Sequence, residues 1–143
     1  MGNEVEEIEV KDISTIIPAI VEHIEDNLPA ILTARTLTDF AEYQTGYATA
    51  QDALSLAVRY AESNESTDET FSFMIHLQLK GQSELNCYGY IDAVREYINS
   101  SLDQEIYEYA RLDYRVMMFD TFEQGIPQVI FDITLSEPLD DCD

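Results

Sequence analysis

Two histidines and two cysteines are the side chains of this sequence best suited to bind a transition metal. They are His23, His76, Cys87 and Cys142, and zinc in proteins is held by four such groups, usually in closely spaced pairs. None of the four lies at ligand spacing from another. His23 lies beside the apolar stripe of a predicted helix, and His76 lies on the less apolar side of a predicted strand. We therefore expect no metal site and two surface or half-buried imidazoles.

Carboxylates are the other abundant reactive groups, with 29 Asp and Glu against 7 Lys and Arg. General acid catalysis needs one carboxyl group that is shielded from water, so that its pKa rises. Most acids of this chain fall in predicted leader, loop and tail segments, where water keeps them ionised. The sequence also lacks a G-x-S-x-G elbow, an H-E-x-x-H motif and a glycine-rich phosphate loop. We expect no catalytic residue, no cofactor-binding residue and no enzyme activity.

The stretch 62–70 is the one segment with enough clustered side-chain oxygens to suggest calcium binding. It lacks the D-x-D-x-D-G spacing of a calcium loop, and it lacks the bidentate glutamate that ends such a loop. We interpret this stretch as the solvated tip of a β-hairpin, and weak calcium binding there stays open.

The formal net charge of −22 limits the classes of partner that this protein can bind. A surface that binds DNA or RNA, or an anionic membrane, needs clustered cations, and this sequence has none. The first residues are acidic where a signal peptide is basic, and no apolar run approaches the ~20 residues of a membrane helix. We expect a cytoplasmic protein with Cys87 and Cys142 unpaired, and a disulfide between them stays open.

The first half of the chain predicts one helix and one β-hairpin. Apolar residues at spacings of three and four predict a helix from Ile13 to Leu28, and Pro29 should end it because the residue before a proline is pushed out of helical geometry. The threonine-rich stretch 30–51 predicts a connection with one helical turn. Alternating apolar and polar residues in 54–60 and 71–79 predict a long hairpin.

The second half predicts the same pair of elements again. An apolar stripe from Ile91 to Leu102 predicts a helix, and residues 112–122 and 126–135 predict two strands joined at Gly125. The fold class is therefore α+β: an antiparallel sheet made from two β-hairpins, with two helices packed on one face. The expected organisation is an acidic leader (1–12), a single domain (13–137) and an acidic tail (138–143).

Four segments between Ile13 and Glu137 carry a resemblance to a known family. They are the helix that ends at Asn27-Leu28-Pro29, the hairpin of Ala53-Leu54-Ser55-Leu56-Ala57-Val58-Arg59-Tyr60 with Thr70-Phe71-Ser72-Phe73-Met74-Ile75, the helix Tyr90-Ile91-Asp92-Ala93-Val94-Arg95-Glu96-Tyr97-Ile98, and the hairpin that ends in Ile130-Phe131-Asp132-Ile133-Thr134-Leu135. Their order resembles that of bacteriophage tail-terminator and tail-completion proteins, the small neck subunits that close the top of a tail tube. The family has no invariant catalytic motif, so no site residue is transferred.

The resemblance implies a homo-oligomeric ring that contacts other phage tail or connector proteins, assembled in the host cytoplasm and then part of the virion. Sheet edges are natural places for such copies to join. The interface hypothesis assigns this role to Phe71, Phe73, Ile75, Leu77, Val129, Phe131 and Ile133. Two other functions stay open. One is an acidic inhibitor that mimics nucleic acid, since 22 charges correspond to roughly 37 Å of duplex. The other is a small cytoplasmic binding module.

Overall fold

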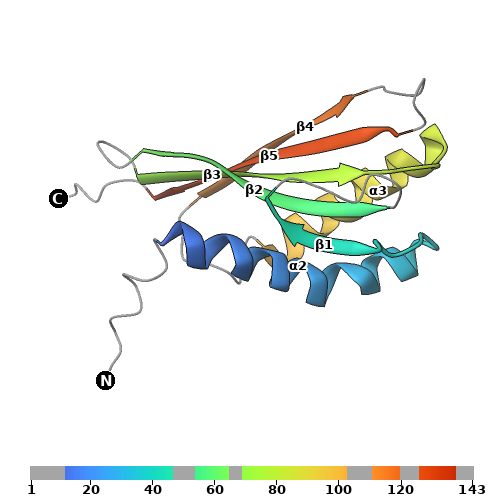
Figure 1. Cartoon of the computed structure of the whole chain (residues 1–143), viewed down its shortest axis with the longest axis horizontal. Coiled ribbons are helices and arrows are strands. Elements are labelled where there is room, and N and C mark those ends of the chain that lie inside the picture. Colours follow the sequence, from blue (N-terminus) through green and yellow to red (C-terminus); the bar gives the residue numbers. More distant parts are fainter. Residues whose placement is uncertain (1–11, 47–53, 65–68, 103–110, 120–125, 138–143) are drawn as a thin grey trace.

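The structure is a computed structural model of the 143-residue chain and describes residues 12–46, 54–64, 69–102, 111–119 and 126–137. Two helices and a five-stranded sheet make up the described part, which confirms the predicted α+β class (Figure 1). The elements in chain order are α2 (Ile13–Ala34), β1 (Glu42–Thr45), β2 (Ser55–Asn64), β3 (Glu69–Gln78), α3 (Glu84–Tyr97), the π-helical turn η1 (Ile98–Leu102), β4 (Arg111–Phe119) and β5 (Gln128–Glu137).

The sheet has the strand order β1-β2-β3-β5-β4. Both predicted hairpins are present, because β2 pairs with β3 and β4 pairs with β5, each antiparallel. The two hairpins merge through an antiparallel pairing of β3 with β5, which makes these the inner strands of the sheet. The short strand β1 was not predicted, and it pairs in parallel with the start of β2.

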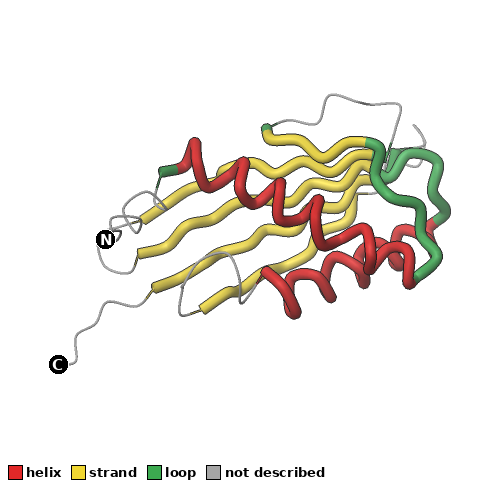
Figure 2. The backbone as a smooth tube through the Cα atoms, turned by 90° about the horizontal axis from the view of Figure 1, so that it is seen from below, coloured by secondary structure: helices red, strands yellow, loops and turns green. Residues whose placement is uncertain are grey.

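One face of the sheet carries the core. Side chains that alternate along the strands point toward the helices, and Phe73, Ile75, Phe131 and Ile133 are all fully buried. Figure 2 shows α2 and α3 on the same side of the sheet, as the sequence predicted. Helix α2 contributes its predicted apolar stripe, and α3 contributes Tyr90 and Tyr97, whose rings are also fully buried. The opposite face of the sheet has no helix from the described residues on it.

Helix α2 does not end before Pro29 as predicted. It runs through Pro29 to Ala34, and Arg35 and Thr36 end it, the latter with a φ of 62°. An internal proline removes one helical hydrogen bond, but the extra turn buries Leu32 completely. The predicted connection 30–51 is therefore wrong in its first part, which is helix, and it also contains β1.

Helix α3 and the first hairpin also have boundaries that differ from the predicted ones. Helix α3 begins at Glu84 rather than near Ile91, because Ser83 caps it: the Asn86 backbone N–H donates to the Ser83 hydroxyl over 3.1 Å. Strand β2 continues to Asn64 and β3 begins at Glu69, so most of the predicted loop 62–70 is strand. Strand β4 is described to Phe119, and the predicted residues 120–122 lie outside the described part.

Candidate functional site: the two edges of the sheet

The seven residues predicted to form an interface are core residues. Phe71 and the other six lie on β3 and β5 and are at most 5% exposed. These strands are paired on both sides, so neither has a free edge. A second copy could reach these side chains only by displacing the helices, and their role in an interface stays a prediction.

Strand β4 forms one edge of the sheet. It pairs with β5 along its whole length, and no described strand lies on its other side. Its side chains alternate between the two faces: Tyr114 and Val116 lie half-buried against the core, and Arg115 points the other way with its side chain 72% exposed. The Arg115 Nε lies 3.6 Å from the nearer Asp132 carboxylate oxygen, a long ion pair at the surface. Phe119 at the end of the strand is 45% exposed.

The opposite edge is shared by β1 and β2. Strand β1 covers only the first residues of β2, from Ser55 to Val58, and the Gly46 N–H donates to the Val58 carbonyl at the end of this cover. Gly46 has a φ of +85°, which is the left-handed region that glycine enters without steric cost, and β1 ends at the preceding residue, Thr45. Beyond Val58, no described strand pairs with the outer side of β2.

A pocket of about 410 Å³ lies beside this uncovered part of β2. Its walls come from the first turns of α2, the end of β1 and the middle of β2, and its lining residues are Ile13, Ser14, Ile17, Pro18, Thr45, Gly46, Val58, Arg59 and Tyr60. Ile13 and Tyr60 are 38% and 39% exposed, which is high for large apolar side chains. A register shift between Tyr60 and Glu62 marks a β-bulge, a feature common at sheet edges.

The face of the sheet without helices carries pairs of polar side chains that bridge neighbouring strands. His76 Nε2 donates to Gln128 Oε1 over 2.7 Å, and the hydroxyls of Ser72 and Thr134 lie 3.0 Å apart. Partial burial lowers the pKa of His76, and the positive charge of Arg59 lowers it further, while the hydrogen bond to Gln128 opposes them. Burial and Arg59 therefore favour the neutral imidazole, and its hydrogen-bond partner is an amide oxygen rather than the carboxylate that orients many general bases.

The other side chains that could bind a metal, those of His23 and Cys87, do not lie close to His76. His23 lies on α2 in the helical layer, where its Nδ1 is hydrogen-bonded to the Tyr97 hydroxyl at 2.7 Å, so the two histidines lie on different sides of the sheet. Cys87 is a free thiol buried in α3, and burial raises its pKa. Cys142 lies outside the described residues, as does most of the tip of the loop 62–70. Among the described residues, no three His, Cys, Asp or Glu side chains are grouped to hold a metal ion.

Sequence comparison gives no relative from which function could be transferred. No protein-family model matches the chain, and no curated protein matches it. Within the described residues, no helix is both long and apolar enough to cross a membrane. Function is therefore inferred from the fold and from its two edges, which the sequence did not reveal because β1 is too short to show an alternating pattern.

Proposed function

We propose that this protein is a structural subunit of a bacteriophage or prophage tail or neck, a ring-forming tail terminator or tail-completion protein. Such a subunit is made in the host cytoplasm and then becomes part of the virion. The order helix, hairpin, helix, hairpin supports the proposal, and β1 adds a short edge strand to it without changing the order of the rest.

The observation that carries the proposal is that no described strand pairs with the outer side of β4 or with the outer side of β2 beyond Val58. An exposed edge strand offers a row of unpaired backbone N–H and C=O groups to another chain, and most monomeric proteins block such edges. Here β4 and the β1–β2 edge lie on opposite sides of one sheet (Figure 1). Two different surfaces on opposite sides of a subunit are what a closed ring of identical copies needs.

The charge of the chain is compatible with this role. Copies that carry a net charge of −22 repel each other, and they repel DNA as well. A ring through which a genome passes benefits from a surface to which DNA does not adhere, and the repulsion between copies is weakened by salt. We propose no enzyme activity, since His76 is paired with an amide and Cys87 is buried.

One observation favours the second candidate function, an acidic inhibitor that mimics nucleic acid. Exposed acids line the outer side of the helical layer, with Glu22, Glu25 and Asp26 on α2 and Asp92 and Glu96 on α3. A mimic needs free carboxylates in such rows.

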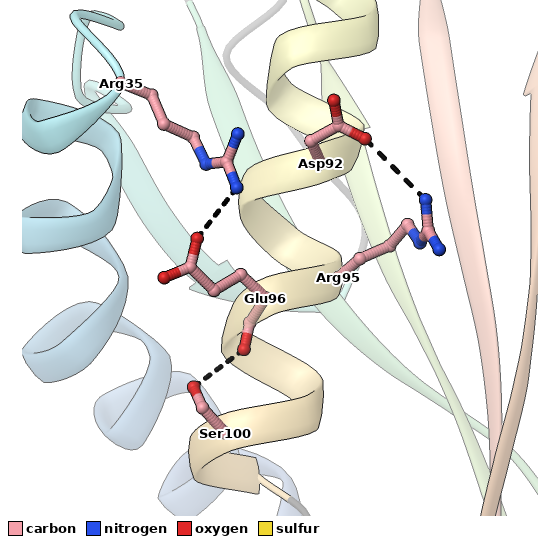
Figure 3. Close-up of polar contacts among 5 residues, drawn as sticks. All are labelled: Arg35, Asp92, Arg95, Glu96 and Ser100. Carbon is pink, nitrogen blue, oxygen red and sulfur yellow. Dashed lines mark hydrogen bonds and ion pairs between the residues drawn. The ribbon is translucent and has the colours of Figure 1, made fainter.

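Two cations interrupt this acidic row on α3, as Figure 3 shows. Arg35 Nη2 donates to Glu96 Oε1 over 2.8 Å, and Arg95 Nη1 lies 3.7 Å from Asp92 Oδ1. Asp92 and Glu96 therefore each have a cation beside them, whereas a mimic needs its carboxylates free. The structural role in a phage tail is the better supported of the two.

Native mass spectrometry over a salt series tests the proposed function, with negative-stain imaging of any assembly. A tail or neck subunit forms closed rings of one defined copy number, and ring formation increases as salt screens the net charge. A protein that stays monomeric at every salt and protein concentration contradicts the proposal. Competition with DNA for a basic enzyme, without ring formation, would support the mimic instead.

A further inference from the structure

The directions of the described strands decide how the two outer edges of this sheet can meet. Strand β1 is parallel to β2, and each of the pairings β2–β3, β3–β5 and β5–β4 is antiparallel. Strand β4 therefore runs opposite to both β1 and β2. A second copy that is rotated about an axis along the strands, without being turned over, places its β1–β2 edge antiparallel to β4 of the first.

The two edges also carry opposite charge. Strand β4 has two arginines, Arg111 and Arg115, against one acid, Asp113, which makes it the only described strand with a positive net charge. At the other edge, β1 contributes Glu42 and no cation, and the uncovered part of β2 contributes Arg59 and Glu62, which leaves this edge with a net charge of one negative unit. In a chain of net charge −22, most pairs of surfaces repel, and these two edges attract.

The faces match as well. Across the sheet, the register pairs Arg115 with Asp132, Asp132 with Met74, and Met74 with Arg59 of β2. Glu42 pairs with Ser55, which lies four residues before Arg59 on β2 and therefore on the same face. Arg115 and Glu42 thus lie on the same face of the sheet. On the other face, β4 presents half-buried Tyr114 and Val116, and the β1–β2 edge presents the pocket.

An antiparallel strand seated along this edge covers the exposed apolar surface of Ile13 and Tyr60. An edge of net positive charge then meets an edge of net negative charge on one face, and apolar groups meet on the other.

From these observations we infer that β4 of one copy pairs antiparallel with the β1–β2 edge of the next copy, so that the subunits join head to tail. This inference rests on the proposed function and deepens it by naming the contact. The pairing continues the sheet from copy to copy and keeps all helices on one side. Because the two surfaces differ, the contact repeats from copy to copy, and a rotation between copies that divides a full turn evenly closes the ring.

Charge reversal at the two edges tests the contact. The single variants are Arg115→Glu and Glu42→Arg, and the third variant combines both. Arg95→Glu is the matched control, because Arg95 is 54% exposed and its 3.7 Å pair with Asp92 resembles the 3.6 Å pair of Arg115 with Asp132. Circular dichroism and thermal unfolding establish that each variant is folded, and native mass spectrometry then measures the protein concentration at half assembly.

We expect each single edge variant to raise the concentration at half assembly by about tenfold, since an attraction becomes a repulsion at every junction of the ring. The double variant should regain most of this loss, and Arg95→Glu should assemble like the unmodified protein. Rings that form equally well in both single variants overturn the inferred contact and leave the ring proposal standing. Assembly that stops at two copies indicates pairing of β4 with itself and also overturns it. Absence of any assembly by the unmodified protein removes the proposed function together with the contact.

Discussion

Replacing Phe131 by alanine separates a core role from an interface role for the inner strands. Phe131 is fully buried on β5, and its ring centroid lies 6.2 Å from that of Tyr114. Removal of a buried phenylalanine side chain costs about 3–5 kcal/mol, which is a third or more of the total stability of many domains. For a chain of this length, a loss of that size lowers the unfolding temperature by about 10 °C or more.

The neighbouring residue Ile130 supplies the control, because it points to the face without helices and is half-buried. Ile130→Ala removes three carbons, each contributing about 0.8 kcal/mol when fully buried, so the expected loss is about 1 kcal/mol. Urea unfolding at low salt, at a concentration where the protein is monomeric, measures both variants. Equal losses for the two residues, or a larger loss for Ile130, would refute the deduced direction of the β5 side chains. So would a Phe131→Ala protein of normal stability that fails only to assemble.

Three further predictions concern the local features that differ most from expectation. The pKa of His76 is lowered, so its contribution to stability is complete above about pH 6.5 and decreases as the pH falls below that value. Between pH 5 and 8, the difference in unfolding free energy between the unmodified protein and the His76→Gln variant should show this slope. Ser83→Ala removes a hydrogen-bonding cap and should cost ~1 kcal/mol in chemical denaturation, whereas Asp12→Ala, at a cap without a side-chain bond, should cost less. Pro29→Ala restores a helical hydrogen bond and should raise stability by ~1 kcal/mol in the same assay.

Each of these predictions has a result that would contradict it. A pH-independent difference between the His76 variant and the unmodified protein would show that burial does not shift this group. Equal effects at Ser83 and Asp12 would remove the role assigned to the Ser83 hydroxyl. A Pro29→Ala variant of lower stability would favour a helix that ends at Leu28, as the sequence alone suggested.

Periodicity was sufficient to predict the two helices and the two hairpins. The alternation of apolar and polar residues in β3 and β5 is regular because one face of each strand is buried under helices. This pattern can be read from each strand by itself, without knowing which strands pair. Helix boundaries were less predictable, since they depend on competition between local and tertiary terms. Pro29 favours an end at Leu28 locally, and the burial of Leu32 one turn later outweighs that preference.

The candidate site was not predictable from the sequence for a different reason. The alternating pattern identifies Phe73 and Phe131 as apolar, but it does not tell whether a strand lies inside the sheet or at its edge. That distinction depends on the pairing of β3 with β5, which joins residues far apart in the chain and leaves β4 outermost. The edge residues Glu42 and Arg115 are ordinary surface charges by sequence, and the contact proposed for them rests on the strand order.

Hydrogen–deuterium exchange of monomer and assembly tests the edge-to-edge contact most directly, because backbone amides at a newly paired edge become protected. We predict that exchange slows on assembly in β4 and along the β1–β2 edge, and that amides of β3 remain as protected as they were in the monomer. Assembly that leaves the exchange of β4 unchanged and protects only the helices would contradict the contact inferred between copies.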